Sequence, residues 1–246
     1  MKLTPELLES VSSQLNPLKE RQLDLRGYTI PAIENLGITR DQQDCIDFTD
    51  NSITVLGNIP LLRRLRTLLL ANNRIAAISA SLHLSVPNLT TLVLTNNNIA
   101  ELGDLEPLKD VKSLQYLSLL GNPVREKKWY REWLAWRIPS LRVLDFQRIR
   151  DKERQAAKAL FLTADNLPTQ LATTISQTVS THSSKPPVTT DEPKPAPQGK
   201  AGRLMSKEEA DKVREAIARA TSVEEIRRLE RMLKEGFLPG MDSVGA

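Results

Sequence analysis

The sequence predicts an α/β fold: a right-handed solenoid in which short coils of chain stack and their strands join into one curved parallel sheet. Three observations predict it. Leucine recurs at a regular spacing through the first 145 residues, an asparagine recurs once in each repeating segment, and aromatic residues make up only 4% of the chain. With so few aromatic rings, the core has to be filled by aliphatic side chains, so the leucine spacing is the signal to follow.

Three consecutive segments carry the full pattern Leu-x-x-Leu-x-Leu-x-x-Asn-x-Leu, with Ile or Val at the last position. Their asparagines are Asn73, Asn97 and Asn122, which are 24 and 25 residues apart (97 − 73 and 122 − 97). This spacing is typical of leucine-rich repeats. Weaker copies at 23–30 and 46–53 bring the expected number of repeats to about five. The inward residues predicted for the three complete repeats are Leu65, Leu68, Leu70, Ile75, Leu89, Leu92, Leu94, Ile99, Leu114, Leu117, Leu119 and Val124.

A single repeat cannot bury its apolar face alone, so the coils must stack on one another. We expect each asparagine amide to bond to main-chain groups of the neighbouring coil. The outward residues of the strands then line one continuous concave face, and we expect function to lie there.

Both ends of a solenoid need a cap, because the last coil otherwise leaves apolar residues and strand edges open. The pattern of residues 126–136 predicts a helix that is ended by Pro139. In this helix Trp129, Trp133 and Trp136 would share one face. Such a face is either the core of a cap or an aromatic platform for stacking bases. We favour the cap core, because an uncovered repeat end lies directly beneath it.

The other cap elements are weaker signals. Thr4 followed by a proline and a glutamate predicts a helix that closes the N-terminal end. Leu141, Leu144 and Phe146 predict a final strand with these side chains inward, and the alanine-rich segment that follows predicts a helix ending near Phe161.

Composition divides the chain into four parts. Residues 1–162 form the solenoid with its caps, and residues 163–203 are rich in Ser, Thr and Pro and are expected to be a flexible linker. Residues 204–240 carry two short amphipathic patterns that predict a C-terminal helical hairpin, and residues 241–246 are a tail.

Bulk properties favour a soluble intracellular protein. The net charge is +4 and the pI is near 9.2, which permits contact with a polyanion but falls short of a dedicated nucleic-acid binder. Cys45 is the only cysteine, so no intrachain disulfide can form. The sequence shows no signal peptide and no apolar run of membrane-spanning length, so no membrane partner is expected.

No pattern in the sequence predicts an enzyme, a metal site or a cofactor. Phosphate loops, dinucleotide fingerprints and nucleophile elbows are absent, and the two histidines have no neighbours at metal-ligand spacing. Catalysis by Cys45 would need a nearby histidine. An acid–base or metal cluster could be imagined from five aspartates, of which the first two and the last face outward from strands: Asp24, Asp47, Asp50, Asp104 and Asp145. The three outward aspartates, Asp24, Asp47 and Asp145, lie on different predicted strands with uncharged residues between them, which favours a polar binding surface.

The residues that alternate with the inward leucines along each predicted strand should form the concave face. Its side chains are small and apolar at the centre and charged at both ends, which favours a bulky protein element such as a helix over RNA as the ligand. The predicted protein-binding residues are Asp24, Arg26, Cys45, Asp47, Thr49, Thr67, Leu69, Ala71, Thr91, Val93, Thr95, Tyr116, Ser118, Leu120, Asp145 and Gln147.

Basic residues gather near the start of the chain, before the third strand and around the C-terminal cap. Such charges usually only solvate a surface, but the cap cluster is dense enough to contact phosphates without reading sequence. The candidates for the RNA backbone are Lys19, Arg21, Lys127, Lys128, Arg148, Arg150, Lys152 and Arg154.

Several of these segments together resemble the A-prime family of U2 small nuclear ribonucleoprotein subunits, from residue 1 to about 162. The resemblance rests on Leu23–Tyr28, Ile33–Gly37, Pro60–Leu65, Glu101–Leu105, Arg142–Gln147 and Lys152–Gln155, and it returns between Ala216 and Gly240.

This resemblance implies a nuclear, non-catalytic splicing protein. Its concave face would hold a helix of the RNA-recognition-motif protein called B-double-prime, and the pair would bind a stem-loop of U2 RNA, mainly through the partner. The C-terminal helices would be free for other spliceosomal proteins. The alternative is a leucine-rich-repeat adaptor of another class, ciliary or phosphatase-regulatory, that uses the same face for a different protein.

Overall fold

The computed structural model describes residues 1–163, 165–180, 203–204 and 237–238. The chain divides into two units, Met1–Val188 and Thr189–Ala246. In the second unit the structure describes only β11 (Arg203–Leu204) and β12 (Phe237–Leu238), which pair antiparallel. The predicted hairpin at 204–240 and most of the predicted linker therefore lie outside the described residues.

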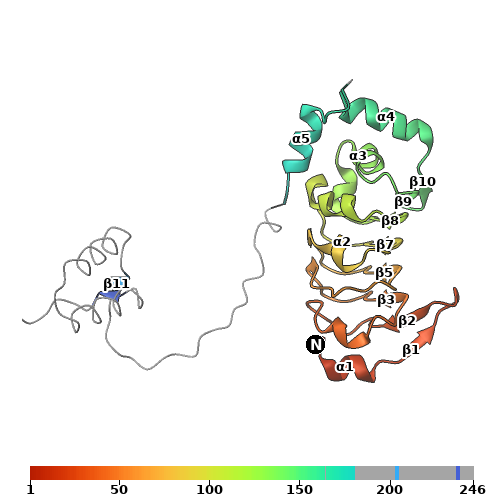
Figure 1. The fold of residues 1–246 in the computed structure, drawn as a ribbon, viewed down its shortest axis with the longest axis vertical. Coiled ribbons are helices and arrows are strands. Elements are labelled where there is room, and N and C mark those ends of the chain that lie inside the picture. Colours follow the sequence, from red (N-terminus) through yellow and green to blue (C-terminus); the bar gives the residue numbers. More distant parts are fainter. Residues whose placement is uncertain (164, 181–202, 205–236, 239–246) are drawn as a thin grey trace, which may run out of the picture. The chain divides into compact units, whose positions relative to one another are not determined.

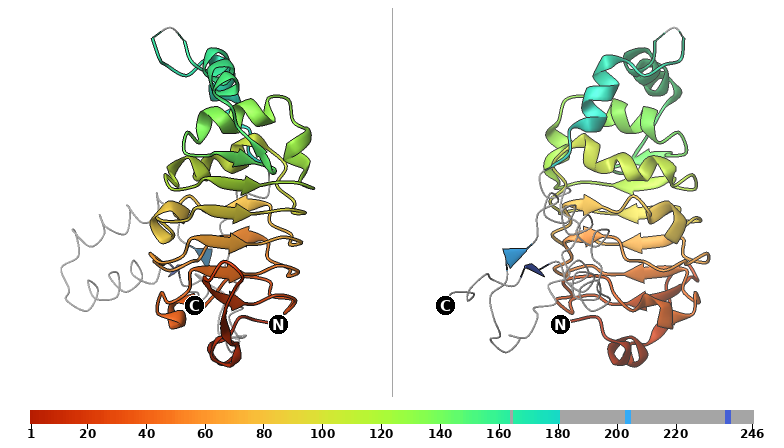
Figure 2. Two further views of the ribbon diagram at one scale, coloured as in Figure 1. Left: turned by 90° about the vertical axis from the view of Figure 1, so that its right-hand side faces the viewer. Right: turned by 60° about the vertical axis from the view of Figure 1, so that its left-hand side comes forward.

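The first unit is the predicted solenoid. The strands of its main sheet lie on one side of the stacked coils, and turns and short elements lie on the other (Figure 1). Figure 2 shows the same sheet from two further sides. In spatial order the eight strands are β1 (Ser13–Leu15), β2 (Arg21–Asp24), β3 (Cys45–Asp47), β5 (Thr67–Leu69), β7 (Thr91–Val93), β8 (Tyr116–Ser118), β9 (Val143–Leu144) and β10 (Gln147–Arg148). Pairing is parallel from β2 to β9 and antiparallel at both ends, so a hairpin closes each edge.

The opposite side of each coil is built from short elements, because about 24 residues per coil leave no room for long helices. They include a small parallel ladder of β4 (Val55–Leu56) and β6 (Ala77–Ile78), and the short helix α2 (Leu82–Ser85). The 3-10 segments are η1 (Leu36–Thr39), η2 (Leu102–Asp110) and η3 (Pro123–Glu126).

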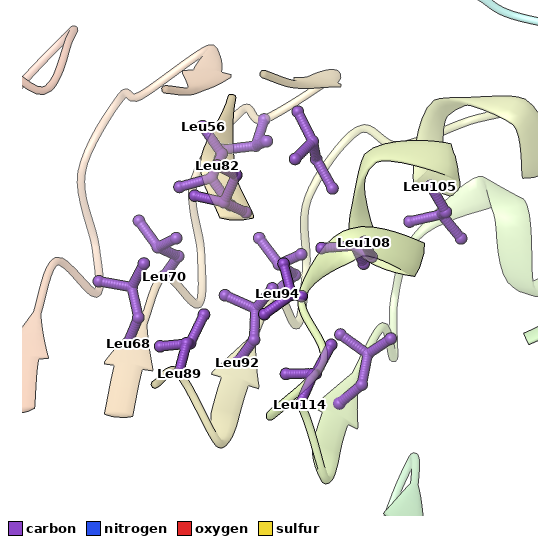
Figure 3. Close-up of a cluster of buried hydrophobic side chains, with 14 of the residues drawn as sticks. Leu56, Leu68, Leu70, Leu82, Leu89, Leu92, Leu94, Leu105, Leu108 and Leu114 are labelled. Carbon is purple, nitrogen blue, oxygen red and sulfur yellow. The ribbon is translucent and has the colours of Figure 1, made fainter. Parts of the chain in front are cut away.

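The leucines fill the space between the two sides (Figure 3). All twelve inward positions predicted for the complete repeats are at most 2% exposed. The strand leucines Leu68 and Leu92 pack beside Leu70 and Leu94 of the following turns, and η2 adds Leu105 and Leu108 from the other side. The repeat pattern therefore predicted the core correctly.

The asparagines form a buried ladder, as expected, and it extends one coil further to Asn51. Asn97 shows the arrangement. Its amide donates to the Leu70 carbonyl at 2.9 Å, and its Oδ1 accepts from the Ile75 amide at 2.9 Å, both on the preceding coil. Each asparagine thus joins two coils by satisfying main-chain groups that the turn leaves unpaired.

The N-terminal cap contains the predicted helix and an unpredicted hairpin. Helix α1 (Pro5–Ser10) begins after Thr4, whose hydroxyl accepts from the Leu7 amide at 3.3 Å, and Leu8 is buried beneath it. The first parallel strand, however, is covered by β1, which pairs antiparallel with β2. Its three residues are all exposed, so β1 carries no inside–outside alternation from which a strand could be predicted.

At the C-terminal end, α3 (Tyr130–Arg137) and α4 (Asp151–Phe161) cover the last coil. Trp133, Trp136 and Phe161 pack together with ring centroids 5.2 Å apart in each pair. The aromatic residues therefore form a cap core. The prediction that Trp129 shares their helical face is wrong: it precedes α3 in the left-handed conformation, with φ of 68°.

The final strand is shorter than predicted. Leu141 and Leu144 are buried, but Phe146 is 75% exposed, so its inward placement is wrong. Asp145 and Phe146 both have positive φ, which turns the chain back from β9 into β10. Because no further coil lies beyond, the sheet ends in this tight reversal.

The boundary predicted after residue 162 is also wrong. Helix α5 (Gln170–Gln177) follows α4 and packs on η2, where a Cβ added to Gly103 would lie 2.3 Å from the Thr178 carbonyl oxygen. The amide and hydroxyl of Ser180 both donate to the buried Asp104 carboxylate, at 2.9 and 3.1 Å. The folded unit thus extends at least to Ser180 within the described residues.

Candidate functional site

The concave face consists of three parallel columns of outward side chains. Strand register sets them, because residues paired across parallel strands project from the same side. The first column is Gln22, Cys45, Thr67, Thr91, Tyr116 and Val143. The second is Asp24, Asp47, Leu69, Val93 and Ser118. The third, just past the strands, is Arg26, Thr49, Ala71, Thr95 and Leu120.

The centre of this face is apolar and half-buried. Leu69 and Val93 lie side by side in the second column, and Ala71 and Leu120 continue the apolar area in the third. Tyr116 is 47% exposed at the side of the cap. Because the threonines between them are short, a bulky element can approach the backbone here.

Four of the predicted contact residues are at most 8% exposed: Cys45, Asp47, Thr49 and Ser118. The Asp47 carboxylate accepts from the Thr49 amide at 2.8 Å, and the Ser118 hydroxyl lies 2.9 Å from that of Thr95. These side chains occupy the predicted columns but have little free surface for a partner. Burial raises the pKa of Cys45 to about 12, so its thiol is a neutral space-filling group.

Two face residues were missed by the pattern, and two were assigned wrongly. Gln22 and Val143 stand in the first column, in register with Cys45 and Tyr116. Both directly precede an inward strand leucine, as Cys45 precedes Ile46, so applying that rule to every repeat would have found them. Gln147 leaves the columns on β10, and the Asp145 carboxylate turns inward to accept from the Leu119 amide at 2.7 Å and the Tyr130 hydroxyl at 2.9 Å.

The two ends of the face differ in charge. Asp24 and Asp47 are register partners on β2 and β3, so two carboxylates lie side by side at the N-terminal end. Arg26 nearby is held by Asp50 at 2.9 Å. Hydrogen bonds from Asn72 and Arg26 hold the pKa of Asp50 below its ordinary value, so this pair stays ionised. A cationic group is therefore favoured at this end.

The cap end carries arginines around a depression of about 430 Å³. Arg142, Arg148 and Arg154 line it together with Tyr116 and the opposing charge of Asp151. Arg154 is also structural, since its guanidinium donates to the carbonyls of Ala135 and Leu141. Two of the predicted RNA-backbone residues, Arg148 and Arg154, thus meet here, and they are joined by Arg142, which was not among those candidates.

The other basic candidates do not join them. Lys127 pairs with Glu101 at 2.5 Å, and the Lys128 ammonium lies over the Trp129 ring, 4.8 Å from its centroid. Arg150 and Lys152 are exposed at the start of α4. Lys19 and Arg21 belong to the hairpin at the far end of the sheet. Of the basic candidates, only Arg148 and Arg154 therefore line the cap depression.

Comparison with known proteins identifies the family. A leucine-rich-repeat family model matches residues 1–176. A protein of Aspergillus fumigatus named U2 small nuclear ribonucleoprotein A′ is 51% identical over 241 residues, covering 98% of this chain and 93% of the relative. Human and Schizosaccharomyces pombe proteins of the same name are each 46% identical, covering 98% and 97% of this chain and 91% and 100% of theirs. The chain belongs to the U2 small nuclear ribonucleoprotein A′ family.

A solved member of this A′ family has the same fold. The crystal structure of the Drosophila melanogaster SNF/U2A′ complex contains a chain that is 54% identical, with a TM-score of 0.65, covering 68% of this chain and 95% of that one. The similarity of the A′ relatives runs over nearly their whole length, so it includes the part of the chain after residue 162. The family resemblance drawn from the sequence is thereby confirmed.

Neither the comparisons nor the described residues indicate catalytic chemistry in this A′-family chain. The matching family model and relatives point to no catalytic family. Within the described ranges, no three His, Cys, Asp or Glu side chains gather as metal ligands, and none of the helices there is long and apolar enough to cross a membrane. His83, in α2, is engaged locally, with Nδ1 3.0 Å from the Ala80 carbonyl oxygen.

Proposed function

We propose that this chain is a non-catalytic scaffold subunit of the U2 small nuclear ribonucleoprotein in pre-mRNA splicing. In this proposal its concave face holds the B-double-prime RNA-recognition-motif protein and supports binding of that protein to a U2 RNA stem-loop. The protein then acts in the nucleus, and residues 204–240 are available to other spliceosomal proteins. The observation that carries the proposal is the apolar centre of the face, on a chain 54% identical to one in the SNF/U2A′ complex.

The dimensions of the face suit a helix. Five strand-to-strand steps separate β2 from β9. At about 4.8 Å per step the face is about 24 Å long, which equals about 16 residues of α-helix. Leu69, Val93 and Leu120 supply apolar contact, and the Asp24–Asp47 pair at one end favours basic residues on the partner.

Calorimetric titration of the full chain with the RNA-recognition domain of B-double-prime tests this proposal. The variant carries Leu69→Glu and Val93→Glu, because both side chains face outward and are half-buried. Burying two unpaired carboxylates in an interface costs several kcal/mol, so we expect affinity to fall by at least about 100-fold. Leu84→Glu, at a side chain 65% exposed on α2, is the matched control and should leave affinity unchanged.

Circular dichroism confirms that each variant is folded before titration. The proposal is wrong if the wild-type chain does not bind the domain, or if the double variant binds as tightly as the control. Recovery of a ciliary or phosphatase protein, without B-double-prime or U2 RNA, would favour the adaptor function instead.

A further inference from the structure

The side of the solenoid opposite the main sheet carries exposed apolar side chains at a fixed spacing. Ile38, Leu61 and Leu84 are each 23 residues apart (61 − 38 and 84 − 61), and they are 39%, 53% and 65% exposed. Each lies two residues after a buried side chain of its own coil, which is Leu36, Ile59 or Leu82. The repeat therefore places one exposed apolar residue on each of three consecutive coils.

Hydrogen bonds and strand pairing set the distance between these residues. The Leu62 amide donates to the Ser85 carbonyl at 2.7 Å, which brings the residues before them, Leu61 and Leu84, side by side. On the same side of the solenoid β4 pairs with β6, so neighbouring coils are about 4.8 Å apart there. Ile38, Leu61 and Leu84 thus form a row about 10 Å long, two coil steps, which we call the apolar stripe.

One flank of the apolar stripe is basic. Arg40 and Arg63 follow Ile38 and Leu61 by two residues, and both side chains are exposed. The Asp41 carboxylate accepts from the Arg63 amide at 3.0 Å, which joins the first two coils of the stripe and engages the acidic group nearest to it in the sequence. Within the described ranges neither Arg40 nor Arg63 forms an ion pair. Carboxylates on a ligand are therefore favoured along this flank.

The next coil shows that a helix can pack on this side of the solenoid. Helix α5 packs on η2, with Ala172 buried and Ile175 partly buried against the core. Pro107 of η2 stands 23 residues after Leu84, where the spacing of the stripe would continue. The coils before η2 present the same side, but their stripe residues remain exposed. They therefore offer an unused surface of the kind that α5 already covers.

An α-helix matches the apolar stripe in length and period. Helical residues i, i+4 and i+7 share one face and span about 10 Å at about 1.5 Å per residue, so each of three apolar side chains would meet one coil. At the first coil, Ile38 and Arg40 line a depression of about 250 Å³ together with Leu8, which gives room for a large side chain. An RNA backbone matches less well, because placing charged phosphates against aliphatic side chains costs free energy.

We propose that the apolar stripe docks an acidic amphipathic helix of another protein. Three apolar residues of that helix contact one stripe residue each, and carboxylates one turn apart on its flank pair with Arg40 and Arg63. The stripe and the concave face lie on opposite sides of the coils, so both can be occupied at once. Docking here does not depend on which protein the concave face holds.

The probe for this surface is a synthetic helical peptide of about 18 residues, long enough to be partly helical alone. It carries leucines at i, i+4 and i+7, glutamates on one flank, and alanine and glutamine elsewhere. Fluorescence anisotropy measures its binding to the full chain. Leu61→Glu with Leu84→Glu should weaken binding at least about tenfold, because two apolar contacts are lost and two carboxylates face the glutamates.

The matched control is Leu15→Glu with Leu18→Glu, at side chains 72% and 78% exposed at the N-terminal end. It should bind the peptide as the wild type does. Circular dichroism confirms that both variants are folded. The inference is overturned if the peptide does not bind the wild-type chain, or if both double variants bind it equally. Neither double variant should change binding of the B-double-prime domain, so this failure is distinct from failure of the proposed function.

A charge variant tests the acidic character of the helix. Arg40→Asn with Arg63→Gln should weaken peptide binding about 3–10-fold at about 0.05 M salt and less at about 0.5 M, because exposed ion pairs are screened. Asparagine is chosen because Arg40 has a φ of 49°. A second peptide with lysines in place of the glutamates should bind the wild type more weakly. Equal binding of the two peptides contradicts an acidic partner.

The natural occupant is found by placing a photo-crosslinking amino acid at Leu84 of the full chain in cells. Mass spectrometry then identifies the cross-linked segment. A segment of another protein with apolar residues at helical spacing and an acidic flank supports the inference. Cross-links to RNA alone, or to this chain itself, overturn it.

Discussion

Replacing Asn97 with alanine tests the account of how the coils are joined. Asn97 is 3% exposed, and its side chain bonds to the preceding coil and to its own turn. The Ile75 amide donates to Asn97 Oδ1, so Asn97→Ala leaves this buried N–H without its acceptor. The carbonyls of Leu70 and Leu94 keep one donor each, from Asn73 and Asn122.

These contacts give the magnitude. One buried, unsatisfied N–H costs about 1–3 kcal/mol, and each of two lost hydrogen bonds about 0.5–1.5 kcal/mol. We therefore expect the free energy of unfolding to fall by about 2–6 kcal/mol. For a folded unit of this size that equals a fall in Tm of about 4–24 °C. Urea titration followed by circular dichroism measures it, with the denaturant slope fitted separately for each variant.

Asn98→Ala is the control, because Asn98 is exposed and follows Asn97 directly. Its effect should stay within about 0.5 kcal/mol. The reasoning about the ladder fails if Asn97→Ala destabilises the chain no more than Asn98→Ala does.

Four further predictions concern the cysteine, the packing of α5 and the C-terminal cap. The thiol of Cys45 should react with Ellman's reagent at pH 8 only after urea unfolding, and rapid labelling of the native chain would contradict its burial. Burial raises the pKa of Cys45 to about 12, so the folded state is stabilised by the neutral thiol at every pH below about 8.5. This stabilisation is lost as the pH rises toward 12. The free energies of unfolding of the wild type and of Cys45→Ala, measured against pH, should therefore converge at high pH. Gly103→Ala should destabilise the packing of α5 on η2 by about 1–3 kcal/mol, because the added methyl group forces the two apart. Amide hydrogen exchange should become faster in Gln170–Gln177 and stay unchanged at β7. Unchanged exchange in α5 would refute this contact. Trp133→Ala should lower the free energy of unfolding by about 3–5 kcal/mol, whereas Leu15→Ala, at a side chain 72% exposed, should have almost no effect in the same urea titration.

The sequence alone determined the repeating part of this protein. Inward leucines, the asparagine ladder and the second and third columns of the concave face all follow from contacts between a residue and its equivalent one coil away. Such contacts recur with the repeat period, so they leave a pattern in the chain. The capping threonine before α1 and the helix ending at Phe161 were also predicted, because they depend on local signals.

Tertiary structure decided what happens where the repeat stops. The β1 hairpin, the reversal at Phe146 and the packing of α5 depend on which edge is left uncovered, and contacts such as Ser180 with Asp104 join residues 76 positions apart. Periodicity contains no information about such unique contacts. For the same reason, the sequence did not show which basic residues form ion pairs. Lys127 and Arg148 look equivalent in the sequence, but packing pairs the first with Glu101 and leaves the second at the cap depression.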